Sequence, residues 1–142
     1  MGRTNRDSGQ SIREQAASMV GDILENGAYA NLLLEKQLRG SAAAAADRRL
    51  LTEIVNGSVR MVKHLDWVLN LFLKGDIDSQ NRWLRNVLRV SAYQILFMEK
   101  VPDYAVVNEA VDIVRKKTGA GLSRVANGVL RSLIRQQKDL CY

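Results

Sequence analysis

Proline is almost absent from this sequence, and no other feature constrains the fold as strongly. Pro102 is the only proline in 142 residues. Proline breaks a helix because it lacks an amide donor and its ring clashes with the preceding turn, so long helices are permitted almost everywhere. Apolar residues recur at spacings of three and four, and no segment sustains the apolar–polar alternation of a strand. The sequence therefore predicts an all-α fold of six or seven helices.

Local signals predict where these helices begin and end. Ser11 with Glu14 three residues later forms a capping box at the start of the first helix, and Gly27 is placed to end it. Asp47 is a good N-cap for the third helix, whereas the alanine run before it fits either a helical extension or a loose connector. The periodicity places the later helices over residues 29–39, 47–73 with a break near 63–65, 82–98, 104–117 and 122–137.

The helix over residues 82–98 is apolar around most of its circumference, which predicts a position at the centre of the fold. We expect Trp83, Leu88, Tyr93 and Leu96 to be buried there. Gly57, inside the third helix, indicates close packing against a neighbouring element. Most aromatic residues fall on apolar helical faces and are expected in the core, which leaves no exposed set on which bases could stack.

Composition narrows the class of protein. Apolar residues make up 46% and charged residues 25% of the chain, as in soluble globular proteins, so we expect one helical domain over residues 11–138 after a flexible basic tail over residues 1–10. Cys141 is the only cysteine, which excludes a disulfide scaffold. No apolar run approaches the roughly 18 residues of a membrane span, and the polar N-terminus lacks a signal-peptide core. The cytoplasm is the expected compartment.

The residue types that carry catalysis and metal binding are scarce. His64 is the only histidine, and neither a catalytic triad nor a metal site can be assembled around it. Gly119-Ala120-Gly121 follows a predicted helix instead of a strand, so we interpret it as a helix C-cap and a turn, not as a phosphate-binding loop. The sequence predicts no catalytic residue, no metal site and no cofactor.

The chain carries a surplus of positive charge. Lys and Arg outnumber Asp and Glu by 21 to 15, a net charge of +6, and this favours a polyanionic partner, nucleic acid first and an anionic membrane second. Three basic clusters stand out, although each also fits a solvated helix face or tail. They are Arg3, Arg6 and Arg13; Arg82, Arg85 and Arg89; and Arg124, Arg131, Arg135 and Lys138. The pattern indicates a basic helical module that binds RNA or protein.

Three segments resemble the NusB-like family, in order and with fitting gaps. Residues 83–97 (WLRNVLRVSAYQILF) are similar to the family's central helix, residues 101–111 (VPDYAVVNEAV) to the helix that follows it, and residues 125–131 (VANGVLR) to its FVNGVL helix. The resemblance covers about residues 11–136. It implies the NusB-like fold, with two small helical bundles packed around the helix over residues 82–98.

The family has two branches. One is the transcription antitermination factor NusB, which binds boxA RNA together with a ribosomal small-subunit protein. The other is the N-terminal RNA-binding domain of the RsmB-type rRNA 5-methylcytosine methyltransferases, which residues 25–34, 47–57 and 65–69 resemble. Gly21 stands where antitermination members usually carry an aromatic residue, and Val125 replaces the family's usual phenylalanine. The methyltransferases continue into a domain that binds S-adenosylmethionine, so this chain is expected to be a separated domain or a free-standing member.

The resemblance implies a non-catalytic domain that binds RNA, either ribosomal RNA for methylation or boxA-like RNA in transcription antitermination. A ribosomal small-subunit protein or a methyltransferase domain would be a further partner, and no membrane is expected. The alternative is a protein-interaction module without RNA contact. Arg89 is expected to face solvent, unless it pairs with a carboxylate inside the bundle. The candidate RNA-binding residues are Arg3, Arg6, Arg13, Arg85, Arg89, Arg124 and Arg131.

Overall fold

The computed structural model describes residues 11–39 and 45–139, and over these residues the fold is entirely helical. This confirms the all-α prediction. The α-helices are α1 (Ile12–Asn26), α2 (Ala30–Arg39), α3 (Ala45–Arg60), α4 (Val62–Asn70), α5 (Arg82–Phe97), α6 (Asp103–Thr118) and α7 (Ala120–Gln136). Two short 3-10 helices, η1 (Ile77–Ser79) and η2 (Gln137–Asp139), precede α5 and follow α7.

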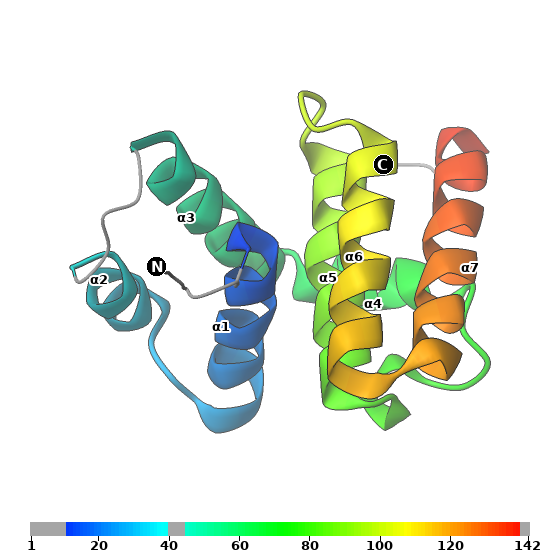
Figure 1. Cartoon of the computed structure of the whole chain (residues 1–142), viewed down its shortest axis with the longest axis horizontal. Coiled ribbons are helices and arrows are strands. Elements are labelled where there is room, and N and C mark those ends of the chain that lie inside the picture. The colour runs from blue at the N-terminus through cyan, green and yellow to red at the C-terminus, as the bar shows by residue number, and fades with distance from the viewer. Residues whose placement is uncertain (1–10, 40–44, 140–142) are drawn as a thin grey trace.

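The helices form two bundles that meet along α5 (Figure 1). In Figure 1 the N-terminal bundle (α1–α3) lies on one side, and the C-terminal bundle (α4–α7) on the other. Helix α5 contacts α1, α3, α4, α6 and α7, and residues 86–95 along it are all buried. The predicted central position of this helix is therefore confirmed. Leu88 and Tyr93 are buried as expected, whereas Trp83 and Leu96 are only half-buried.

The ends of α1 follow from local sequence signals. The hydroxyl of Ser11 accepts a hydrogen bond from the Glu14 amide at 3.1 Å, and Gly27 ends the helix in the left-handed region at φ 72°, where glycine avoids the Cβ clash of other residues. The reciprocal half of the predicted capping box is not formed. The Glu14 carboxylate instead accepts a hydrogen bond from Lys116 on α6. Glu14 therefore links α1 to α6 and does not cap its own helix.

Three predicted boundaries differ from those in the structure. Asp47 is not an N-cap, because Ala45 is already helical and α3 includes the end of the alanine run, whose helix propensity is high. The predicted break within residues 47–73 is confirmed, but it falls at Met61, slightly ahead of the predicted 63–65. Gly119 ends α6 with φ 109°, but α7 begins at once with Ala120. The predicted turn after Gly119 is therefore a direct junction between two helices.

Gly57 lets α3 approach α5. A Cβ at Gly57 would lie 2.1 Å from the ring carbon Cζ of Tyr93, far inside van der Waals contact. The predicted close packing at Gly57 is confirmed, and its neighbour is the Tyr93 ring.

The expectation that most aromatic residues lie in the core was wrong for four of them. The exposed fractions are 72% for Tyr29, 55% for Trp67, 38% for Phe97 and 72% for Tyr104. Tyr29 precedes α2, Phe97 is the last residue of α5, and Trp67 and Tyr104 lie on helices with exposed faces. Apolar spacing alone could not show which of these rings the packing covers. The surface therefore offers aromatic rings that the sequence did not predict.

Candidate nucleic-acid interface

Arg85 is engaged by a carboxylate on α1. Its Nε and Nη2 donate to the two oxygens of Glu25 at 2.9 and 2.6 Å, and its Nη1 donates to the carbonyl of Gln80 at 2.7 Å. This is the bidentate geometry in which arginine binds carboxylates most strongly. The Arg85 guanidinium lowers the pKa of Glu25, and Glu25 in turn raises the pKa of Arg85. The pair joins α1 to the start of α5.

Arg89 is buried, which corrects the expectation that it faces solvent. Only 4% of the residue is exposed. Its Nε and Nη2 donate to the two oxygens of Asp66 on α4 at 2.8 and 3.0 Å, and Nη2 also lies 3.3 Å from Asp78 in η1. The side-chain Oδ1 of Asn86 accepts from Nη1 at 3.0 Å. The guanidinium therefore holds α4 and η1 against α5.

Arg13 also pairs with side chains of other helices. Its Nε donates to the Gln94 side chain on α5, and its Nη1 forms an ion pair with Glu109 on α6. Arg13, Arg85 and Arg89 together tie α1, α4, α5 and α6 to one another. Their role as RNA contacts stays a prediction, and any such contact would compete with these carboxylates.

Lys116 and Lys117 at the end of α6 belong to the same structural network. Glu14, which is 2% exposed, lies 2.6 Å from the Lys116 Nζ and 3.3 Å from the Lys117 Nζ. Burial raises the pKa of Glu14, but the hydrogen bond and charge of Lys116 and the charge of Lys117 outweigh it, so the pKa is lowered overall. Lys117 also sits over the Trp83 ring at 4.9 Å, a cation–π contact.

The exposed face of α7 presents arginines without acidic partners. Arg124, Arg131 and Arg135 are exposed, and across the described residues no carboxylate forms an ion pair with any of them. Arg131 donates to Asn127 at 2.9 Å and Arg135 to Ser132 at 3.0 Å, both on the same helix. These neutral partners orient the guanidinium groups and leave their positive charge uncompensated.

Two glycines flatten this face of α7. Gly121 and Gly128 are exposed, and a Cβ built on either one would meet nothing within 4 Å. A glycine inside a helix destabilises it by about 0.5–1 kcal/mol relative to alanine, and no packing inside the described chain requires it here. Val125 between them is 38% exposed. The face can therefore be approached closely by the backbone of a ligand.

A groove between α6 and α7 continues this face. It has a volume of about 400 Å³ and is lined by Tyr104, Asn108, Arg131 and Arg135, among others. Tyr104 stands in the first turn of α6 with 72% of its surface exposed. An exposed ring beside two guanidinium groups is suited to base stacking with phosphate contact. Sequence reasoning missed Tyr104 and Asn108, because their position opposite Arg131 depends on how α6 packs on α7.

Other predictions concern residues that lie outside the described part of the chain or can be compared with only part of it. Arg3 and Arg6, and the tail over residues 1–10 to which they belong, lie outside the described residues. Within residues 11–39 and 45–139, no cluster of His, Cys, Asp and Glu could hold a metal ion. Over the same residues no helix has the length and apolar character needed to cross a membrane.

Sequence comparison finds relatives among rRNA methyltransferases. The chain is 35% identical over 126 residues to the probable ribosomal RNA small subunit methyltransferase B of Bacillus subtilis (strain 168), covering 89% of this chain and 28% of that protein. It is 31% identical over 129 residues to the corresponding Synechocystis protein, covering 91% and 29%. The chain thus spans less than a third of the length of these relatives.

Comparison with solved structures and with family models points to one fold. NusB in a complex of the antitermination factors NusB and NusE with dsRNA superposes with a TM-score of 0.78 at 21% identity, covering 87% of this chain and 93% of that one. T. maritima NusB superposes with a TM-score of 0.78 at 16% identity, covering 88% of this chain and 89% of that one. The model of the NusB family matches residues 10–135. The chain therefore belongs to the NusB family.

Proposed function

We propose that this domain binds RNA through the exposed face of α7 and the α6–α7 groove, and that it performs no catalysis of its own. The observation that carries the proposal is the set of three exposed arginines, Arg124, Arg131 and Arg135, that no described carboxylate neutralises. Tyr104 adds a ring on which a base can stack. Phosphate contacts from arginine supply most of the affinity, and stacking favours unpaired bases.

Ribosomal RNA is the proposed partner, and positioning it for methylation is the proposed role. The support is that the Bacillus and Synechocystis relatives carry the name of small-subunit rRNA methyltransferases. A methyltransferase domain, in the same protein or another, would supply the chemistry, and the cytoplasm would be the compartment. Arg3 and Arg6 of the basic tail remain predicted contacts that would add to the α7 face.

Transcription antitermination is the second candidate function, favoured by the structural match to NusB. The glycine at position 21 argues against an antitermination role. Antitermination members usually carry an aromatic residue at this position, whereas a Cβ at Gly21 would lie 2.8 Å from Asn86 Nδ2 and 3.0 Å from Arg82 Nη2, so a larger side chain would require both groups to move. The methyltransferase role is therefore the better supported of the two.

Fluorescence anisotropy with labelled single-stranded fragments of small-subunit rRNA tests the proposal. We expect the logarithm of the affinity to fall linearly with the logarithm of salt concentration, by about 0.7 per phosphate contact. The triple variant Arg124→Ala, Arg131→Ala and Arg135→Ala should bind more weakly and with a slope smaller by about 2. Arg115→Ala is the matched control, because Arg115 is exposed on α6 but already paired with Asp112.

Two outcomes would overturn the proposal. One is a triple variant that binds RNA with the affinity and salt slope of the wild-type protein. The other is a wild-type protein that binds no RNA but captures a purified ribosomal small-subunit protein with an affinity independent of salt. The second result would favour the protein-interaction alternative.

A further inference from the structure

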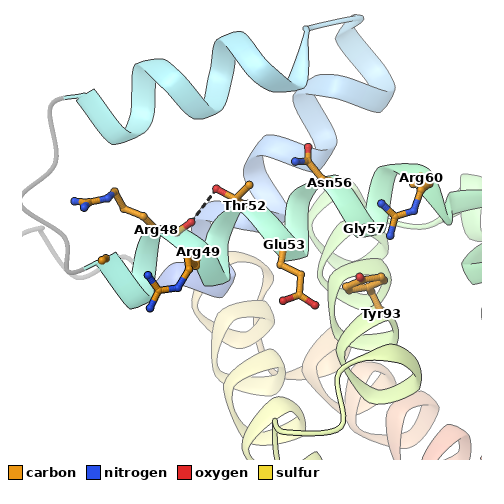
Figure 2. A pocket seen from close by; sticks show the side chains of 9 residues that line it. Arg48, Arg49, Thr52, Glu53, Asn56, Gly57, Arg60 and Tyr93 are labelled. Carbon is orange, nitrogen blue, oxygen red and sulfur yellow. Dashed lines mark hydrogen bonds between the residues drawn. The ribbon is translucent and has the colours of Figure 1, made fainter.

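A second hollow lies on the other bundle, along α3 (Figure 2). Its volume is about 460 Å³, and the side chains that matter for its chemistry are Arg49, Glu53, Asn56 and Arg60 from α3 and Tyr93 from α5. Figure 2 shows Arg49, Glu53 and Arg60 extending to the same side of α3, the side on which Tyr93 lies. This hollow has no part in the proposed function.

The two arginines stand at opposite ends of the hollow. Arg49 and Arg60 are eleven positions apart, which is about 16 Å along a helix that rises 1.5 Å per residue. Both are exposed, and over residues 11–39 and 45–139 neither forms an ion pair with a carboxylate. At about 3.4 Å of axial spacing per phosphate in one strand, the separation matches on the order of five stacked nucleotides.

Hydrogen-bond donors and acceptors both lie between the two arginines. Glu53 and Asn56 are exposed on α3, and no described side chain accepts from or donates to either of them. A carboxylate accepts hydrogen bonds from amino groups such as the cytosine N4, and an asparagine amide can pair with adenine N6 and N7. The centre of the hollow thus offers contacts to base edges, and its ends offer contacts to phosphates.

The wall of the hollow is fixed by packing. The Tyr93 ring lies directly against Gly57, where no side chain could be added, and its centroid is 5.4 Å from that of Phe97. Tyr93 is only 5% exposed, so it cannot swing away as a surface tyrosine does. The groups on α3 are therefore presented beside a rigid wall.

We propose that this hollow binds a short unpaired stretch of RNA, with phosphates on Arg49 and Arg60 and the amino group of a base donating to Glu53. The proposal rests on the proposed function and adds a second, base-selective contact. An acidic peptide is the competing ligand, but Glu53 in the middle would repel a run of carboxylates. Helices α3 and α7 lie at opposite ends of the molecule in Figure 1, so short RNAs can probe each contact separately.

The first test measures phosphate contact. The probes are single-stranded RNAs of about 12 nucleotides, and the variant is Arg49→Ala with Arg60→Ala. We expect a loss of affinity of about tenfold and a salt slope smaller by about 1.4, since each lost contact to a single strand removes about 0.7. Arg115→Ala serves again as the control. Circular dichroism should show an unchanged melting temperature, because both arginines are exposed.

The second test measures base selection, which a merely electrostatic patch would not show. The probes differ only in their central nucleotides, which are all guanosine, cytidine, adenosine or uridine. The wild-type protein should bind the uridine probe most weakly, because uracil is the one base of the four without an amino group that could donate to Glu53. Glu53→Gln should shift the preference toward adenosine, because a glutamine amide pairs with adenine N6 and N7. Glu99→Gln, at another exposed glutamate, should keep the wild-type order.

The outcomes separate the two proposals. If the wild-type protein binds RNA and the α7 triple variant weakens it, while the Arg49 and Arg60 variant behaves as Arg115→Ala, the α3 proposal is overturned and the proposed function stands. An unchanged base order in Glu53→Gln also overturns the α3 proposal. So does displacement of the RNA by a polyglutamate peptide that binds Glu53→Gln more tightly. A wild-type protein that binds none of the probes overturns both.

Discussion

Arginines that look equivalent in the sequence have different surroundings in the structure. Arg89 and Arg131 both lie on helical stripes of basic residues, yet Arg89 is 4% exposed and paired with Asp66, whereas Arg131 is exposed and donates to Asn127. The spacing of each stripe was predictable. The partner of Arg89 lies 23 positions away on another helix, so its burial depends on packing that no local pattern encodes.

Arg89→Ala should destabilise the fold strongly. Removing one member of a buried ion pair leaves the other charge uncompensated, which costs about 3–5 kcal/mol, and the partial exposure of Asp66 places the expected loss near 3 kcal/mol. Urea denaturation monitored by circular dichroism measures it. Arg124→Ala should change the free energy of unfolding by less than about 0.5 kcal/mol. A loss below 1 kcal/mol for Arg89→Ala would contradict the role assigned to the ion pair.

Two glycine substitutions should change stability in opposite directions. Gly57→Ala forces its Cβ into the Tyr93 ring and should destabilise the protein by about 1–3 kcal/mol, as overpacking does. Gly128→Ala, on the open face of α7, should stabilise it by about 0.5–1 kcal/mol, because alanine is the better helix former. Thermal unfolding of both variants compares them directly. Gly128→Ala should also weaken RNA binding, and equal RNA affinity would show that the face is not closely approached.

At the scale of elements, the sequence predicted helices well wherever a local signal ends them. Ser11 and Gly27 place α1 correctly because capping involves only nearby residues. The start of α3 was missed because an alanine run carries no stop signal, and the α3–α4 break was placed too late because Met61 resembles any other helical residue. Boundaries that packing determines cannot be found from periodicity alone.

The contacts of α1 with α5 and α6 should make stability dependent on pH. The pKa of Glu25 is lowered by Arg85, and that of Glu14 is lowered overall by Lys116 and Lys117. A lowered carboxyl pKa contributes stability that is present above the usual value of 4.5 and is lost as the pH falls through the folded-state pKa. We expect Glu25→Gln to show a flatter decrease in melting temperature below about pH 4.5 than the wild-type protein. Equal slopes would contradict the pairing of Glu25 with Arg85.

Helix α2 should open before the others. Among its residues with described side chains, only Leu34 is buried, and Leu32 is 58% exposed. Regions that bury few apolar contacts exchange amide hydrogens through local opening. Hydrogen exchange should therefore label α2 much faster than α5, whose residues 86–95 are buried. Comparable protection of the two helices would contradict this prediction.

At the scale of the whole molecule, the resemblance to one family predicted the architecture correctly. The three matching segments lie in the central helix α5 and in α6 and α7, which pack against it. The candidate site was predicted only in part. Arg124 and Arg131 are exposed as an RNA contact requires, but Tyr104 and the α3 hollow depend on which faces of the helices remain uncovered. Helix packing determines which faces remain uncovered. Because packing cannot be derived from local spacing, the exposed aromatic residues were predicted to lie in the core.

The domain should not bind S-adenosylmethionine. Binding that cofactor would require a strand followed by a glycine-rich loop and a helix, and the described residues contain no strand. Isothermal titration calorimetry of the purified 142-residue chain with the cofactor should show no heat of binding. Micromolar affinity would contradict the non-catalytic role.

The buried position of Arg89 also determines how α4 aligns against α5 within the C-terminal bundle. An α5 lined only with leucine and valine could slide by one turn against α4 with little change in buried area. With Arg89 in place, such a slip would carry the guanidinium away from Asp66 and Asp78 and leave it unpaired among apolar side chains, at a cost of several kcal/mol. The charge thus selects one register of α4 against α5 out of several that apolar packing alone would allow.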